Sequence, residues 1–272
     1  MVSPTAAGAA LIGLIAAAAD PKAGRRVVVC TDFDGTLAPI LLEPAAVIPA
    51  PGAVEALVAC ADAGALVVIV TGRPASFVAA RLGIAAAVVE VCGLYGLERL
   101  APGAADVETH PLAAGWRAVV AEAVRAAIDE APDGVLVEPK GLAVAVHYRG
   151  APSEQGWVEA WTVAAAARTG LVAHAGRMHV ELRPPLKRDK GSVVEEVGAG
   201  HGPLVFLGDD LGDVPALEAL ATARAAGRVT GAVVVASDEA DPRLAALADV
   251  VVADPAAAVA WLDALAAALV RG

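Results

Sequence analysis

Aromatic side chains and positive charge are both scarce in this sequence of 272 residues. Phe, Trp and Tyr together make up 3% of the chain, and alanine dominates the apolar residues, so the core must be packed with small side chains. The formal net charge is −11, and no basic patch with interleaved aromatic residues is visible. Phosphate backbones and anionic lipids repel such a chain. We therefore expect neither nucleic acid nor a membrane as its partner.

Cysteine is also rare, and its distribution argues against a disulfide framework. The three residues are Cys30, Cys60 and Cys92, an odd number without the spacing of metal ligands. Each lies in or beside an apolar segment, which is typical of reduced, buried thiols in a cytoplasmic protein. Cys30 stands close to the candidate site described below, but its strand context and the lack of a nearby histidine favour a packing role over a nucleophilic one.

A charged leader is absent as well. Residues 6–19 are apolar, yet no positively charged segment precedes them, and the stretch is short for a membrane span. The pattern therefore favours a helix packed on the core over a signal peptide. We expect a soluble, cytoplasmic protein of one large or two modest domains.

Two carboxylates follow an apolar, strand-like run at residues 27–31. Asp32 and Asp34 are spaced two residues apart, so a strand ending here presents both at the carboxyl edge of a sheet, where open α/β folds place their sites. Gly35 allows a sharp turn or a close approach to a ligand. Neighbouring carboxylates repel each other unless a cation or a shared proton relieves them. The pair therefore indicates a chemical site; the alternative is an exposed strand end with an aspartate turn.

The string DFDGTL at residues 32–37 resembles the first motif of the haloacid dehalogenase-like (HAD) hydrolases. Three further motifs of that superfamily follow in the same order, each at the end of an apolar strand or the start of a helix. They are Thr71-Gly72-Arg73 after 67–70, Asp189-Lys190-Gly191, and Gly208-Asp209-Asp210-Leu211-Gly212-Asp213 after 204–207. Four motifs in order identify the chain as similar to this superfamily, which has a doubly wound parallel sheet.

The order of expected elements supports an α/β core with an insertion. Strands and helices alternate from residue 27 to 91, which is typical of a parallel sheet covered by helices on both faces. The middle of the chain contains helix, two strands, helix and two strands, at 116–130, 134–138, 141–148, 153–168, 171–174 and 178–182, with a hairpin turn at 175–177. We predict a doubly wound parallel-sheet HAD core at 1–97 and 187–272, and an inserted α+β cap domain at 98–186.

The resemblance implies roles for four residues in phosphate ester hydrolysis. Asp32 is expected to be the nucleophile that forms an aspartyl-phosphate, and Asp34 to protonate the leaving oxygen and then to activate water. Thr71 and Lys190 are expected to stabilise charge on the transferred phosphoryl group. Lys187 is an alternative to Lys190, but the Asp-Lys-Gly context favours Lys190.

A magnesium ion is the cofactor that the resemblance implies. Mg²⁺ prefers hard oxygen ligands, and the expected ones are Asp32, the main-chain carbonyl of Asp34, and Asp209. Asp210 and Asp213 are expected either to bind the metal directly or to orient its other ligands. For Asp213 alone, a polar turn that caps a helix is the alternative.

Within the superfamily, the chain is most similar to the trehalose-6-phosphate phosphatases. The supporting segments are GLYGLE at 93–98, VEPKGL at 137–142, HYR at 147–149 and HVELRP at 179–184. The insertion lies between the second and third motifs, the position of a type 2 cap. The resemblance implies that Glu138, Lys140 and Glu181 hold sugar hydroxyls. It also implies that Gly72 binds the substrate and that Arg73 contacts the substrate or pins the cap.

Several alternatives remain open at this point. The fourth motif has Val214 where the family often has glutamate, which leaves the substrate less certain than the reaction. Another HAD phosphatase, acting on sucrose phosphate or a glycosyl-phosphoglycerate, is the second hypothesis, and a phosphomutase is weaker. A catalytically idle regulatory domain is the third, although the expected catalytic residues are all present. We expect a sugar phosphate as the only partner, and the sequence is compatible with a monomer.

Overall fold

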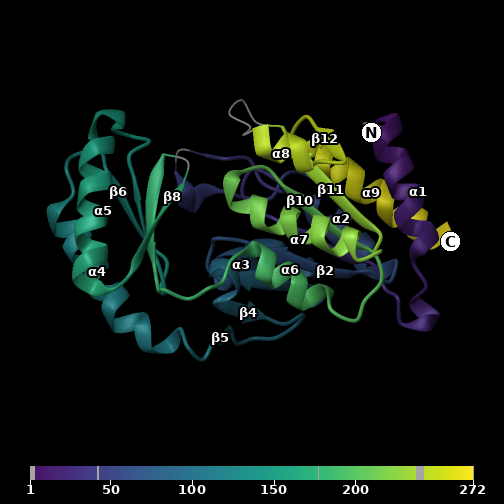
Figure 1. Ribbon diagram of the computed structural model, residues 1–272, viewed down its shortest axis with the longest axis horizontal. Helices are drawn as coiled ribbons and strands as arrows, with labels where there is room; N and C mark the ends of the chain where they lie inside the picture. Colours follow the sequence, from purple (N-terminus) through teal and green to yellow (C-terminus); the bar gives the residue numbers. More distant parts are fainter. Residues whose placement is uncertain (1–3, 42, 177, 237–241, 272) are drawn as a thin grey trace. The chain divides into compact units, whose positions relative to one another are not determined.

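Figure 1 shows the computed structural model of the chain, which describes residues 4–41, 43–176, 178–236 and 242–271. The chain divides into two compact units. The larger unit combines Met1–Val107 with Arg188–Gly272, and the smaller unit is the continuous segment Glu108–Lys187.

The larger unit is built on a mostly parallel sheet. Its strands lie in the order β12-β11-β10-β1-β2-β3-β4, and only the pairing of β3 with β4 is antiparallel. The strands are β1 (Val28–Thr31), β2 (Leu66–Val70), β3 (Val89–Gly93), β4 (Glu98–Leu100), β10 (Leu204–Gly208), β11 (Thr230–Val235) and β12 (Val250–Val252). The predicted α/β class with a doubly wound parallel sheet is confirmed.

Helices cover both faces of this sheet, which explains its continuous apolar strands. Val29 packs against helices on one face of the sheet, whereas Val28 and Cys30 pack against helices on the other. The first face carries α1 (Ala6–Ala18), α2 (Ala53–Asp62), α3 (Ala75–Leu82) and α9 (Pro255–Arg271). The second carries α6 (Lys190–Gly198), α7 (Val214–Ala225) and α8 (Pro242–Leu247).

The apolar N-terminal stretch forms the predicted helix α1. Thr5 caps it by accepting a hydrogen bond from the Gly8 N–H at 3.2 Å, and Leu11, Ile12 and Ile15 are buried in the core. Within the residues that the structure describes, no helix has both the length and the apolar character needed to cross a membrane.

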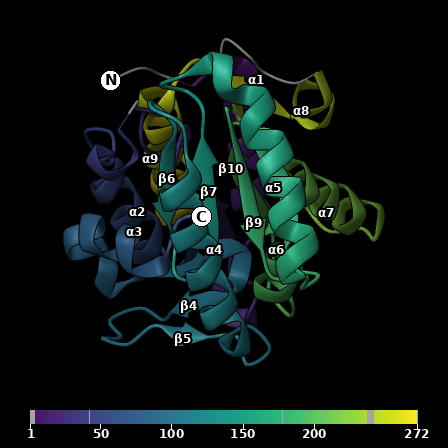
Figure 2. The ribbon, with the colours of Figure 1, turned by 90° about the vertical axis from the view of Figure 1, so that its left-hand side faces the viewer.

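The smaller unit has an antiparallel sheet with two helices on one face (Figure 2). The sheet order is β6-β7-β9-β8, from β6 (Leu136–Pro139), β7 (Val144–His147), β8 (Val172–Gly176) and β9 (His179–Arg183). The helices are α4 (Arg117–Glu130) and α5 (Gln155–Thr169), and a short strand β5 (Glu108–Thr109) precedes them. Val144, Val146 and Leu182 face the helices, so alternation places polar strand residues on the opposite face. The predicted turn at 175–177 includes Arg177, which lies outside the described residues.

The division between the units falls later in the chain than the predicted start of the insertion at residue 98. Strand β4 pairs with β3 in the larger sheet, and the carboxylate of Glu98 accepts a hydrogen bond from the Ala75 N–H at 2.9 Å, at the start of α3. Leu100 is buried in the larger core. A strand of three residues is too short to show an alternating pattern, which explains why the sequence analysis missed it.

Seven short 3₁₀ helices complete the described elements: Pro21–Ala23, Pro44–Ala46, Gly83–Ala87, Leu94–Gly96, Ala114–Trp116, Pro152–Glu154 and Leu211–Asp213. Two of them lie at the ends of sheet strands, since Leu94–Gly96 follows β3 and Leu211–Asp213 follows β10. The second of these carries Asp213, which is part of the site described next.

Candidate active site

The site of the larger unit lies at the end of β1, the strand from which the sheet extends in both directions. From β1 the chain proceeds to β2 and β3 on one side, and later to β10 and β11 on the other. Asp32 follows β1 and Asp209 follows β10, and the Asp32 N–H donates to the Leu207 carbonyl at 2.9 Å. Open α/β sheets bind ligands at such a point, beyond the carboxyl ends of the strands.

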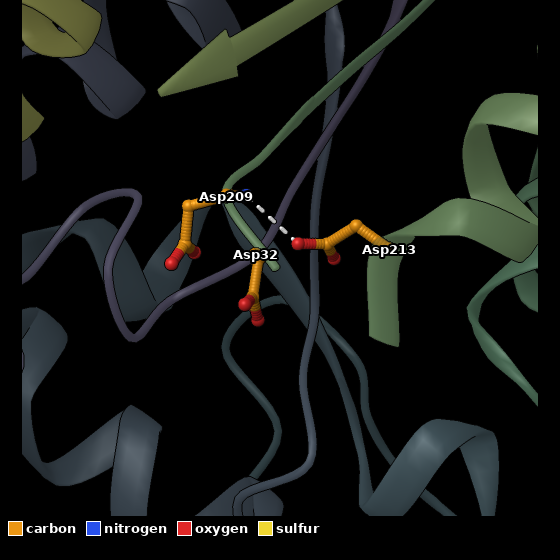
Figure 3. A group of neighbouring side chains, drawn as sticks. All are labelled: Asp32, Asp209 and Asp213. Atoms are coloured by element: carbon orange, nitrogen blue, oxygen red, sulfur yellow. Dashed lines mark hydrogen bonds between the residues drawn. The ribbon is translucent and has the colours of Figure 1, made fainter. Parts of the chain in front are cut away.

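Three buried carboxylates meet there (Figure 3). Asp32, Asp209 and Asp213 each contribute an oxygen atom that lies within 4.8 Å of the other two. Burial, together with the charges of Asp213 and Asp210, raises the pKa of Asp209 to about 8. Burial and neighbouring acids likewise raise the pKa of Asp32 well above its usual value, although Lys190 opposes them. Such a cluster of hard oxygen donors fits a divalent cation, which would relieve this repulsion.

Asp213 uses its oxygens differently from the other two acids. Its Oδ2 accepts the main-chain N–H groups of Asp209 at 2.9 Å and Asp210 at 3.1 Å, and its Oδ1 accepts from Lys190 Nζ at 2.6 Å. A Cβ atom on Gly208 would lie 2.5 Å from the Asp213 carboxyl carbon, so only glycine fits there. These contacts favour an orienting role for Asp213, one of the three alternatives given by the sequence.

Asp210 also bonds within its own loop. Its Oδ1 accepts the Gly212 N–H at 2.8 Å, which caps the turn Leu211–Asp213 that leads into α7. Thr36, which the sequence analysis did not single out, donates from its hydroxyl to Asp209 Oδ1 at 2.9 Å. Its position inside the DFDGTL string was the available signal. Gly35 has a φ of +78°, and a Cβ there would lie 2.0 Å from Asp209 Oδ2.

Lys190 is a buried cation of the site. Its Nζ lies 2.9 Å from Asp32 Oδ2 and 2.6 Å from Asp213 Oδ1. Burial alone would lower the pKa of Lys190, but the carboxylates of Asp213 and Asp32 raise it well above its usual value. The group therefore stays charged beside Asp32. Lys187, the alternative from the sequence, is exposed.

Thr71, Gly72 and Arg73 follow β2, on the other side of β1 from Asp209. The Arg73 N–H donates to Thr71 Oγ1 at 3.1 Å, which leaves the threonine hydroxyl hydrogen available for another acceptor. The Arg73 guanidinium binds both oxygens of Asp34, with Nε at 2.8 Å from Oδ2 and an Nη atom at 2.6 Å from Oδ1. It also lies over the Phe77 ring, 4.6 Å from the centroid. The sequence predicts Arg73 at the substrate or the cap, whereas this ion pair is visible only in the structure.

The predicted sugar-binding residues lie together in the smaller unit. Lys140 Nζ is 3.0 Å from Glu181 Oε1 and 3.8 Å from Glu138 Oε2. Ala145 pairs with Glu138 on one neighbouring strand and with Glu181 on the other. The side chains of Glu138, Ala145 and Glu181 therefore project from the same face of the sheet. Burial alone would raise the pKa of Glu181, but the charges of Lys140 and Arg183 hold it below its usual value. This cluster presents closely spaced carboxyl and amino groups that suit a polyhydroxy ligand.

Two histidines on the same face were not foreseen as part of this cluster. His147 Nε2 lies 2.9 Å from Glu138 Oε2, and its ring centroid is 5.0 Å from that of His179. The two residues pair across β7 and β9. Their alternation with apolar residues along each strand was the signal that could have placed them on this face.

The cysteines are buried free thiols. Burial raises the pKa of the Cys30 thiol, which disfavours the thiolate that a nucleophile needs. Cys30 packs with Val28 on one face of the sheet, in agreement with the packing role expected from the sequence.

Comparison with known proteins gives a consistent result. A model of the trehalose-phosphatase family matches residues 30–249. The trehalose-phosphate phosphatases of Mycolicibacterium paratuberculosis and Mycobacterium avium are each 36% identical over 264 residues, which covers 93% of this chain and 66% of each relative. The chain therefore spans just under two thirds of the length of these curated relatives.

Solved structures share the fold. The C-terminal domain of the C. albicans trehalose-6-phosphate phosphatase has a TM-score of 0.75 at 20% identity, with 98% of both chains covered. A trehalose-6-phosphate phosphatase related protein has a TM-score of 0.71 at 22% identity, over 86% of this chain and 95% of its own. At these identities, the likeness shows a common architecture.

Proposed function

This chain belongs to the trehalose-phosphatase family, and we propose that it hydrolyses trehalose 6-phosphate to trehalose and inorganic phosphate. The observation that carries the proposal is the placement of Asp32, a buried carboxylate at the end of β1 that lies 2.9 Å from the ammonium of Lys190. A nucleophile beside a fixed positive charge, in a cluster of acids suited to a cation, is the arrangement that phosphoryl transfer requires.

The proposed reaction has two steps. A carboxylate oxygen of Asp32 attacks phosphorus while the bond from phosphorus to the sugar oxygen breaks, and Asp34 donates a proton to that oxygen. In the second step Asp34 removes a proton from water, which attacks the phosphorus of the aspartyl-phosphate and releases Asp32 and inorganic phosphate. Lys190 and the Thr71 hydroxyl offset the charge on the phosphoryl oxygens in both steps.

Mg²⁺ is the proposed cofactor, because hard carboxylate oxygens line the site. Asp32, the main-chain carbonyl of Asp34, and Asp209 would hold the ion. When bound, it supplies positive charge that balances the acidic cluster and the phosphoryl group. Asp213 orients Lys190 and the main chain at Asp209, and Asp210 shapes the loop that carries them.

The smaller unit is proposed to act as the cap that recognises the sugar. Glu138, Lys140 and Glu181 form hydrogen bonds to its hydroxyl groups, and charged partners make such bonds strong. Binding energy from these remote contacts positions the ester for attack. The pairing of Lys140 with both carboxylates keeps the three groups in fixed positions relative to one another.

Phosphate release in the presence of Mg²⁺ tests the proposal. The substrates are trehalose 6-phosphate, sucrose 6-phosphate, glucose 6-phosphate and p-nitrophenyl phosphate. A clear preference for trehalose 6-phosphate supports it. Equal or greater activity on another sugar phosphate would assign the chain to a different sugar phosphatase activity, and no release from any of them would favour an idle regulatory domain.

A further inference from the structure

The turn after β3 holds two consecutive residues in the left-handed region of backbone conformation. Leu94 has a φ of 47° and Tyr95 a φ of 59°. Residues with a Cβ rarely adopt this region, since it brings the Cβ close to the following carbonyl oxygen. Such strain persists only where the surroundings hold it, and it is concentrated at functional sites. The turn therefore calls for a functional explanation.

Hydrogen bonds fix this turn to the loop that contains the proposed phosphoryl-binding residues. The Leu94 N–H donates to the Arg73 carbonyl at 2.9 Å, and the Tyr95 N–H donates to the Thr71 carbonyl at 3.0 Å. A Cβ on Gly93 would lie 2.4 Å from the Ala75 nitrogen, which shows how closely the two segments pass. The two left-handed residues thus each donate a main-chain hydrogen bond to this loop.

The phenol of Tyr95 lies directly against Gly72. A Cβ on Gly72 would come within 2.7 Å of the Tyr95 hydroxyl oxygen and 2.9 Å of the ring carbon that bears it. The hydroxyl therefore stands beside Gly72, which follows Thr71, the residue whose carbonyl accepts the Tyr95 N–H.

We propose that Tyr95 is a further phosphoryl-site residue, whose hydroxyl donates a hydrogen bond to a nonbridging oxygen of the bound phosphoryl group. This inference rests on the proposed function, since it takes the loop of Thr71 and Gly72 as the one that flanks that oxygen. A phenol is well suited to the position because it donates to an anionic oxygen without adding a charge. Recognition by Tyr95 depends on the phosphoryl group and is independent of the sugar.

The variant Tyr95→Phe tests the inference, with inorganic phosphate as the probe. Phenylalanine keeps the ring against Gly72 and removes only the hydroxyl. Titration calorimetry in the presence of Mg²⁺ should show phosphate binding weakened by about 10- to 100-fold, as expected for a lost hydrogen bond to a charged group. The value of kcat/KM should fall by a similar factor on trehalose 6-phosphate and on p-nitrophenyl phosphate.

Tyr148→Phe is the matched control, because Tyr148 is the other tyrosine of the chain and lies in the smaller unit. Its phosphate binding should equal that of the wild-type protein. Thermal melting checks that Tyr95→Phe remains folded. Tyr95→Asn is a second variant without the phenol, since asparagine adopts the left-handed region more readily than most residues, and it should show the same loss.

Phosphate binding by Tyr95→Phe within twofold of wild type would overturn the inference, as would a loss confined to trehalose 6-phosphate. Failure of the proposed function gives a different result. In that case the wild-type protein hydrolyses none of the substrates, whereas the calorimetric comparison of phosphate binding still decides the role of Tyr95. A wild-type protein that neither binds phosphate nor hydrolyses an ester would overturn both.

Discussion

The buried guanidinium of Arg73 donates hydrogen bonds to both carboxylate oxygens of Asp34, although the two residues are 39 positions apart in the sequence. In the proposed reaction, Asp34 must give a proton to the leaving sugar and later take one from water. A carboxylate held by both oxygens has a fixed orientation, so the arginine determines where Asp34 stands before substrate arrives. One of the two oxygens must leave the guanidinium to carry the proton of the first step. Arg73, from the motif at 71–73, thus positions Asp34, from the motif at 32–37.

Replacing Arg73 by lysine should impair proton transfer to the leaving group. Lysine retains the charge but cannot form the bidentate pair, so kcat/KM on trehalose 6-phosphate should fall roughly tenfold. Hydrolysis of p-nitrophenyl phosphate should fall much less, because nitrophenolate departs without a proton. Steady-state kinetics on both substrates measures the difference. An equal loss on the two would show that Arg73 supports the fold or the phosphoryl site instead.

Asp32→Asn should abolish turnover while the protein stays folded. The amide is nearly isosteric with the carboxylate but cannot attack phosphorus. Removal of one charge from a buried acidic cluster should leave the melting temperature in chelator unchanged or higher. Phosphate release and thermal melting are the two measurements. Appreciable activity in the purified variant would remove Asp32 from the role of nucleophile.

Mg²⁺ should stabilise the folded protein as well as activate it. A cation bound to the buried carboxylates relieves their repulsion, so the melting temperature should rise when Mg²⁺ replaces chelator. Asp209→Asn should lose most of this rise, whereas Asp254→Asn, at an exposed acid before α9, should keep it. Calcium should inhibit, because it prefers longer bonds and more ligands. Full activity in excess chelator would contradict the metal assignment.

Glu138→Gln should reduce activity on trehalose 6-phosphate selectively. Loss of a charged partner to sugar hydroxyls should lower kcat/KM about 10- to 100-fold, and p-nitrophenyl phosphate, which has no sugar, should be hydrolysed at nearly the wild-type rate. Glu122→Gln, at an exposed acid on α4, is the control and should behave as wild type. A parallel loss on both substrates would exclude a role of Glu138 in sugar recognition.

The buried pair of Glu181 and Lys140 should make stability depend on pH in the acid range. Because the pKa of Glu181 is held below its usual value of 4.5, the pair stabilises the fold above about that pH. The stabilisation is lost as the pH falls further, through the pKa of the folded state. Urea unfolding at pH 7 and at pH 4 should therefore show a larger acid-induced loss in wild type than in Glu181→Gln. Equal losses would show that Glu181 is not held ionised by its neighbours.

The sequence predicted the parallel sheet and the positions of the motifs because both depend on local patterns. A run such as 27–31 indicates a buried strand, and an acid at its end must lie at the carboxyl edge of the sheet. The order of four motifs then placed Asp32, Lys190 and Asp209 in one unit, as the structure shows.

The contacts that distinguish one acid from another were beyond the sequence. Nothing in the string GDDLGD tells that Asp213 accepts two main-chain N–H groups and a lysine, because those bonds depend on the exact path of the loop. The ion pair of Arg73 with Asp34 and the strained turn at Tyr95 likewise depend on how separate strand ends meet. Long-range geometry of this kind leaves no periodic trace in the chain.

The interrupted chain path of the larger unit has a consequence for biosynthesis. Thr36 and Asp209, which are hydrogen-bonded in the folded protein, are 173 residues apart in the sequence, and the whole smaller unit is translated between them. The smaller unit is continuous in sequence and has its own apolar core. It can therefore fold during translation, before β10, the neighbour of β1 in the larger sheet, has been synthesised. Asp32 and Lys190 come together only afterwards, which means that a growing chain carries the proposed nucleophile before it has the neighbouring groups that would activate it.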